Sequence, residues 1–191
     1  MKALANFLFE TGMLKRTPRS GLQFLGSGSE TVAEHSFRVI MITYTLAHMD
    51  SAVDENRALK MALVHDILES RTGDLNYVNK KYLTVDEEKA VQDVTGPLPF
   101  GPEMKELLRE FRAKETPESL IVNDADQLEL ILMLKEYGDL GNKYSKDWIS
   151  FALKRLRTAA ARQLAETILT TDSTDWWFEE KDEWWVWGNK G

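Results

Sequence analysis

The three histidines of this chain are the first residues to weigh, because imidazole binds metals and titrates near neutral pH. His65 has Asp66 beside it and Glu69 one helical turn later, within an apolar run. At about 100° per residue, His65 and Glu69 lie about 40° apart on a helix, and Asp66 and Glu69 about 60°. Burying these groups together is costly unless a cation holds them. We therefore predict a divalent metal ion, and this donor set suits Mn, Fe, Co, Ni or Zn.

The other two histidines occupy different positions. His48 lies near the end of an expected helix, where a cation is favourable, and we interpret it as structural or surface. His35 lies in the first turn of that helix, after the capping-box pair Thr31 and Glu34. His35 thus lies on a different helix from His65.

Two aspartates, Asp124 and Asp126, stand in a further apolar helical segment. Periodicity alone does not choose between them as ligands, because both have apolar neighbours one helical turn away. We expect the aspartate that does not bind the metal either to be solvated or to contact one of the metal-ligating residues.

The loop from residue 15 to 29 is rich in Gly and Ser and carries the cations Lys15, Arg16 and Arg19. Such a run is usually a solvated face, and anion binding is the alternative. The chain has a net charge of −7 and an isoelectric point near 5.1. An acidic protein repels a polyanion, so we exclude nucleic-acid polymers as partners. A small anionic substrate remains compatible with this charge if a few cations gather in a cleft.

The elements that must position these residues are helices. A length of 191 residues fits one domain, and helical periodicity dominates. We predict an all-α fold, a single bundle of about six or seven helices. After an amphipathic N-terminal helix, the expected helices span residues 32–49, 55–70, 85–94, 102–114, 116–138 and 146–169.

Composition limits the cysteine chemistry, the membrane association and the cellular compartment that we expect. The absence of Cys excludes disulfides, thiolate zinc sites and Cys nucleophiles, and it suits a reducing compartment. No apolar run approaches the length of a membrane helix, so we expect no membrane partner. We read the first apolar stretch as a helix rather than a signal peptide, and we expect a cytoplasmic protein.

The last 20 residues differ in composition from the rest. Five of the six Trp lie there, among Asp and Glu. We therefore divide the chain into a domain, residues 1–171, and a Trp-rich acidic tail, residues 172–191. The tail is expected to be an aromatic flap packed on the body or on a second subunit, with a substrate lid as the alternative.

The order His, then His-Asp, then Asp, each on its own helix, resembles the HD-domain superfamily of metal-dependent phosphohydrolases. Within this superfamily, the local sequence motifs most resemble those of the 5′-deoxynucleotidases, over roughly residues 4 to 140. The matching segments are Leu14–Gly21, Glu30–His35, Val64–Glu69, Thr72–Leu75 and Asp126-Gln127. The resemblance implies one divalent ion (Co, Mn, Fe, Ni, Zn or Mg). It implies the ligands His35, His65, Asp66 and Asp126, with Asp126 rather than Asp124 as the family aspartate.

The resemblance also implies catalytic roles near the phosphate for Glu69 and Asp74, which could hold a second ion with the backbone of Leu75. For Glu69, the alternative is an ion pair with Arg71 or Arg38.

In the cationic loop, the resemblance implies that Arg16 binds the phosphate. The further substrate-binding candidates are Lys15, Thr17, Arg19 and, more weakly, Arg38. Some bacterial members carry an aromatic residue where this chain has Thr17. The choice of deoxyribose over ribose is therefore left open.

These features predict a metal-dependent phosphomonoesterase that converts nucleoside 5′-monophosphates, chiefly deoxy forms, to nucleoside and orthophosphate. Glu69 would act as general base or as proton donor. The resemblance also implies a homodimer, and the segment 146–169, with Trp148 and Phe151, could supply a partner face or simply pack in the core. One alternative is another nucleotide substrate: a triphosphate, a cyclic nucleotide or a guanosine polyphosphate. Another is a non-catalytic metal-binding scaffold.

Overall fold

The computed structural model describes residues 1–178, 185 and 188. Within these residues the secondary structure is helical, and the only β pairing is an isolated bridge between Pro18 and Thr31. Eight α-helices have nine residues or more, where six or seven were expected. They are α1 (Lys2–Thr11), α3 (Val32–Met49), α4 (Glu55–Val64), α6 (Glu87–Thr95), α7 (Gly101–Ala113), α8 (Pro117–Asp139), α9 (Ser145–Leu153) and α10 (Ala159–Thr170). The predicted all-α class is confirmed.

Shorter helical turns connect these elements. They are the 3₁₀ turns η1 (Gly12–Lys15) and η2 (Asn79–Lys81) and the α-helical turns α2 (Leu22–Leu25), α5 (Glu69–Thr72) and α11 (Asp175–Phe178). Among the described residues, no helix is long and apolar enough to cross a membrane.

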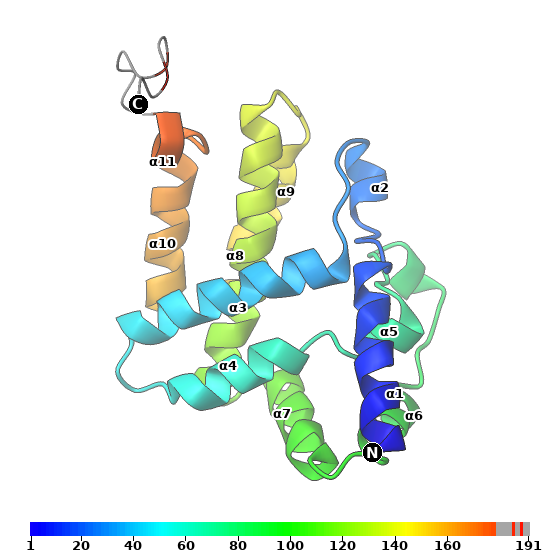
Figure 1. Cartoon of the computed structure of the whole chain (residues 1–191). Helices are drawn as coiled ribbons and strands as arrows, with labels where there is room; N and C mark the ends of the chain where they lie inside the picture. Colours follow the sequence, from blue (N-terminus) through cyan, green and yellow to red (C-terminus); the bar gives the residue numbers. More distant parts are fainter. Residues whose placement is uncertain (179–184, 186–187, 189–191) are drawn as a thin grey trace.

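Helix α8 is the central element of the bundle (Figure 1). It contacts α3, α4, α7, α9 and α10. Its apolar residues are buried on several sides, among them Ile121, Leu128, Ile131 and Leu134, each at most 1% exposed. A helix that is apolar nearly all round belongs inside a bundle. Side chains on α8 can therefore meet groups from helices that are far apart in the sequence.

Helix α3 begins as expected at Thr31. The Thr31 backbone N–H donates to Glu34 Oε2 at 2.7 Å, and the Glu34 N–H donates to Thr31 Oγ1 at 3.3 Å. This capping box fixes the first turn, which carries His35. Helix α3 crosses α8 (Figure 1), and His35 contacts Asp126 and Glu129 in the middle of α8.

The single helix expected over residues 146–169 is wrong, because the structure has two helices, α9 and α10, with a break at residues 154–158. Thr158 caps the start of α10, and Asp124 of α8 stabilises the break. Its carboxylate accepts hydrogen bonds from the backbone N–H groups of Arg157 and Thr158 at 2.8 and 2.7 Å, and from Thr158 Oγ1 at 2.8 Å. Asp124 is fully buried, so of its two expected roles the solvated one is wrong, and these hydrogen bonds go to the break rather than to a ligand residue.

The helix expected over residues 55–70 is also shorter than predicted. Helix α4 ends at Val64, and residues 65–68 form a turn before α5. His65, Asp66 and Glu69 therefore do not share the face of one continuous helix. The turn itself, rather than helical spacing, directs these side chains inward.

Part of the Trp-rich tail is described. Helix α11 presents Trp176 and Trp177, which are 85% and 46% exposed. The rest of the flap or lid expected over residues 172–191 lies outside the described residues, at 179–184, 186–187 and 189–191. The division at residue 171 stays a prediction.

Candidate functional site

The predicted metal ligands meet at one point. His35 Nε2 lies 3.4 Å from both Asp66 Oδ2 and Asp126 Oδ1, and His65 Nε2 lies 3.2 Å from Asp66 Oδ2. Ligand atoms of His35, His65 and Asp126 all lie within 4.8 Å of one another. Helix α3, the turn after α4 and helix α8 thus each contribute to a cluster of two imidazoles and two carboxylates.

The two imidazoles are held in the orientation that metal ligation requires. His35 Nδ1 is 2.6 Å from Glu129 Oε2, and His65 Nδ1 is 2.7 Å from the Ala62 carbonyl oxygen. A neutral imidazole that donates through Nδ1 keeps a lone pair on Nε2. Both Nε2 atoms are buried and have no hydrogen-bond partner. The residues present therefore fit a divalent ion.

The titration of the cluster is also consistent with a cation site. Burial would lower the pKa of His35, but the nearby carboxylates of Asp126, Asp66 and Glu129 raise it well above the usual value. Burial would raise the pKa of Asp66, yet His65 and His35 hold it well below the usual value. The carboxylates thus attract positive charge to this point, which a proton or a metal ion can supply.

Glu129 is a residue that the sequence analysis missed. It is fully buried on α8, and its Oε1 accepts hydrogen bonds from Arg38 Nε at 3.1 Å and Nη2 at 2.8 Å. Arg38 also donates to Glu136 at 2.7 Å, and it does not line the cavity described next. A carboxylate three residues after Asp126 in an otherwise apolar run was the available signal.

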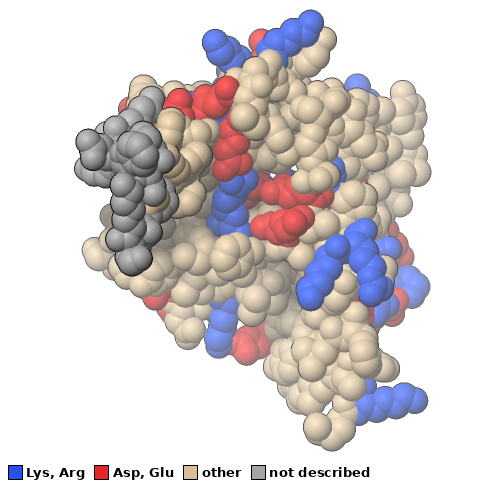
Figure 2. Space-filling view, turned by 45° about the horizontal axis from the view of Figure 1, so that its top comes forward, with Lys and Arg blue, Asp and Glu red and all other residues tan. Residues whose placement is uncertain are grey.

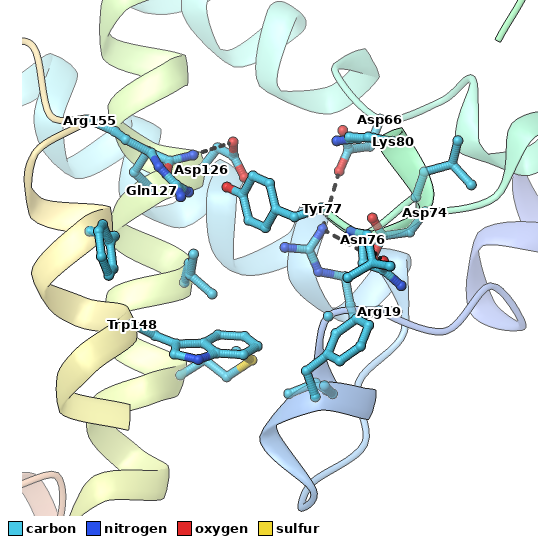
Figure 3. Close-up of a pocket in the computed structure, with 18 of the residues that line it drawn as sticks. Arg19, Asp66, Asp74, Asn76, Tyr77, Lys80, Asp126, Gln127, Trp148 and Arg155 are labelled. Carbon is cyan, nitrogen blue, oxygen red and sulfur yellow. Dashed lines mark hydrogen bonds and ion pairs between the residues drawn. The ribbon is translucent and has the colours of Figure 1, made fainter. Parts of the chain in front are cut away.

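A cavity of about 490 Å³ opens onto the cluster (Figure 3). Its size is typical of small-molecule sites. It is lined at one end by Asp66 and Asp126, and by four of the other predicted residues, Arg19, Glu69, Asp74 and Leu75. A cavity that holds cations, carboxylates and a metal-ligand cluster is suited to a small anionic substrate.

Comparison with known proteins places this geometry in a family. A family model described as HD domain matches residues 11–168. The chain belongs to the HD-domain family. A 5′-deoxynucleotidase HDDC2 of Danio rerio is 33% identical over 149 residues, which cover 75% of this chain and 74% of the relative.

Two solved structures resemble this HD domain. One is a conserved hypothetical protein from Pyrococcus furiosus, with a TM-score of 0.77 and 33% identity, covering 86% of this chain and 98% of that one. The other is a predicted metal-dependent phosphohydrolase from Magnetospirillum magnetotacticum. Its TM-score is 0.69 and its identity 27%, over 88% of this chain and 90% of that one. The predicted membership of the HD-domain family is confirmed.

Glu69 of this HD domain has no ion-pair partner at Arg71 or Arg38. Arg71 pairs with Glu10, and Arg38 with Glu129 and Glu136. Glu69 Oε2 is buried without a hydrogen bond. Burial, followed by the charges of Asp66 and Asp74, raises the pKa of Glu69 to about 9. A carboxyl group in this state is suited to proton transfer.

Asp74 is held by its backbone and by a neighbouring loop. Gly73 precedes it with φ of 70° and ψ of 163°, a conformation that is essentially restricted to glycine. Asp74 Oδ2 accepts a hydrogen bond from the Ser20 backbone N–H at 2.8 Å. The Thr72–Leu75 segment is thereby fixed beside the cationic loop.

Of the cations in that loop, Arg19 reaches the HD-domain cavity. Its Nη1 lies 4.0 Å from Asp66 and 3.9 Å from Asp74. Lys15 and Arg16 are exposed and do not line the cavity, and the Thr17 carbonyl oxygen accepts from the Val32 N–H at 2.9 Å. Phosphate binding by Lys15, Arg16 or Thr17 stays a prediction. Arg19 lies beside the cluster of predicted metal ligands, next to Asp66.

His48 lies outside the site, as expected. It is at the surface, with Nδ1 3.3 Å from Glu55.

Proposed function

We propose that this HD-domain protein is a metal-dependent phosphomonoesterase that hydrolyses deoxynucleoside 5′-monophosphates to nucleoside and orthophosphate. The observation that carries the proposal is the pair of buried, unpartnered Nε2 atoms of His35 and His65, which converge with two carboxylates beside a cavity. The name of the Danio rerio relative, 5′-deoxynucleotidase, supports the substrate class.

His35, His65, Asp66 and Asp126 would hold the ion. When bound, a divalent ion supplies a Lewis acid for a phosphoryl oxygen and for the attacking water. Arg19 would bind the phosphate, because a guanidinium can donate two parallel hydrogen bonds to phosphate oxygens. Its position is fixed by the hydrogen bond from its own N–H to the Glu30 carbonyl oxygen at 2.9 Å.

Glu69 would donate a proton to the leaving 5′-oxygen. Burial and the charges of Asp66 and Asp74 raise its pKa, so this carboxyl group is able to exchange a proton beside the substrate. Asp74 would hold Arg19 toward the phosphate. Glu69, Asp74 and the Leu75 backbone line the same cavity, and the stoichiometry of metal binding decides whether they hold a second ion.

The homodimer and the cytoplasmic location are part of the proposal. Trp148 and Phe151, suggested above for a partner face, line the cavity instead. Helix α3 supports association, since Phe37, Met41 and Tyr44 are exposed at helical spacing along it. The absence of Cys supports a reducing compartment.

Product analysis tests the activity. Metal-stripped protein is incubated with ribo- and deoxynucleoside mono- and triphosphates, with and without Co, Mn, Mg or Zn. We expect metal-dependent orthophosphate release from deoxynucleoside 5′-monophosphates, lost in His65→Ala and kept in His48→Ala, which removes the surface imidazole. Release of pyrophosphate or triphosphate would point to a nucleoside triphosphate as substrate. Inactivity on this panel, and then on cyclic nucleotides and guanosine polyphosphates, would favour a scaffold.

A further inference from the structure

The cavity has an end that the phosphate chemistry does not use. Away from the carboxylates and Arg19, its walls are largely apolar and aromatic. They include Phe24, Tyr77, Leu130, Met133 and Trp148, together with the cation Arg155. The aliphatic residues come from α8, Trp148 from α9, and Tyr77 from the loop after α5. An end of this composition can hold the uncharged part of a nucleotide.

Tyr77 is kept in the cavity by a cation rather than by core packing. Its side chain is 64% exposed, and Figure 3 shows it projecting into the cavity. The Arg155 guanidinium lies over its ring, 4.9 Å from the centroid. This cation–π contact joins the loop after α5 to the break between α9 and α10.

Arg155 is in turn connected to the cluster of predicted metal ligands. Its Nη1 donates to Gln127 Oε1 at 3.2 Å, and Gln127 Nε2 donates to Asp126 Oδ2 at 2.9 Å. The aromatic wall is therefore fixed relative to a predicted metal ligand. A substrate whose phosphate lies at the cluster would meet this wall with its other end.

Trp148 contributes an aromatic surface from the other side of the cavity. It is half-buried, and Figure 3 shows it pointing into the cavity from α9, whereas Tyr77 enters from the opposite loop. Leu130 and the buried Met133 add aliphatic surface from α8 to the lining. The space thus combines aromatic groups that enter from two different elements with an apolar contribution from a third.

We propose that this end is the nucleobase subsite, in which a purine or pyrimidine ring stacks on the Tyr77–Arg155 pair and is bounded by Trp148. This inference rests on the proposed function. Stacking on aromatic and guanidinium planes suits any base, because every base has a π face. The remaining Arg155 N–H groups can donate to a ring nitrogen or keto oxygen in the plane of the base.

The test separates the base from the rest of the substrate. We compare kcat/KM for a deoxynucleoside 5′-monophosphate with kcat/KM for 2-deoxyribose 5-phosphate, which carries the same sugar and phosphate without a base. We expect the wild type to prefer the nucleotide, and Tyr77→Ala and Arg155→Ala each to reduce that preference about fivefold or more. Tyr77→Phe, which keeps the ring, should retain it.

The matched control is Tyr82→Ala, which removes an 81% exposed tyrosine that does not line the cavity, and its preference should equal that of the wild type. An unchanged preference in both Tyr77→Ala and Arg155→Ala would overturn the subsite. If neither substrate releases phosphate, the proposed activity is at fault. Binding of deoxynucleosides, measured by equilibrium dialysis with the same variants, then supports or overturns the subsite without turnover.

Discussion

A single buried carboxylate determines which nitrogen of His35 can bind a metal. Glu129 fixes Nδ1 at 2.6 Å and leaves Nε2 directed at Asp66 and Asp126. Partners of this kind raise ligand basicity and fix the ring orientation.

We expect Glu129→Gln to weaken metal binding by about 10- to 100-fold, because the variant keeps the shape of the side chain but loses its charge. Isothermal titration of the metal-stripped protein measures this directly. Glu136→Gln is the control, since Glu136 also pairs with Arg38 but is not a partner of His35. Equal affinities for Glu129→Gln and the wild type would contradict the role assigned to Glu129.

Glu69 gives the metal-free chain a pH-dependent stability. Its pKa rises from 4.5 to about 9 on folding, so between these values the folded chain binds a proton that the unfolded chain has lost. Its contribution to stability is therefore present below pH 4.5 and is lost as the pH rises through about 9.

Between pH 4.5 and about 9, we expect the Tm of the metal-free wild type to fall relative to that of Glu69→Gln. Thermal unfolding followed by circular dichroism measures both values. The exposed Glu115→Gln should show no such divergence from the wild type. A difference between wild type and Glu69→Gln that stays constant with pH would rule out this account of Glu69.

At the scale of elements, local signals predicted some helices well and missed others. Thr116-Pro117 and Gly138 marked the ends of α8, and the structure confirms a helix over Pro117–Asp139. The break between α9 and α10 contains neither Gly nor Pro. Thr158 caps α10 locally, and Asp124, more than 30 residues earlier, binds the backbone N–H groups of Arg157 and Thr158. The wall formed by Tyr77 and Arg155 was missed for the same reason, because Arg155 reaches the cavity from that break.

The capping role of Asp124 predicts a stability effect. Asp124→Asn would place an amide N–H₂ among backbone donors in a fully buried position, so we expect the free energy of unfolding to fall by about 1–3 kcal/mol. Urea denaturation measures the change. Asp147→Asn, on the exposed first turn of α9, should stay within about 0.5 kcal/mol of the wild type. A similar small change in Asp124→Asn would contradict the cap.

At the scale of the whole molecule, the site exists only when the bundle is assembled. The order of ligand types along the chain resembles the HD-domain pattern, and this resemblance, rather than residue type alone, selected His35, His65, Asp66 and Asp126. Which loop cation reaches them was not predictable from composition, since Arg16 and Arg19 differ only in where the folded loop points them. Figure 2 shows acidic and basic side chains beside one another in the hollowed middle of one face. At the cavity, the cation Arg19 among the carboxylates would let a chain of net charge −7 bind a small anion.

The most direct test of the account is a metal titration of the stripped protein during turnover of a deoxynucleoside 5′-monophosphate. We predict no orthophosphate release without metal and a rise to a plateau at one ion per chain. A plateau at two would support the second ion proposed at Glu69 and Asp74. Asp126→Asn should abolish the rise, and Asp139→Asn, at the end of α8, should reproduce the wild-type curve. Full activity in the stripped protein, or an unchanged curve for Asp126→Asn, would contradict a metal-dependent phosphomonoesterase built on these four ligands.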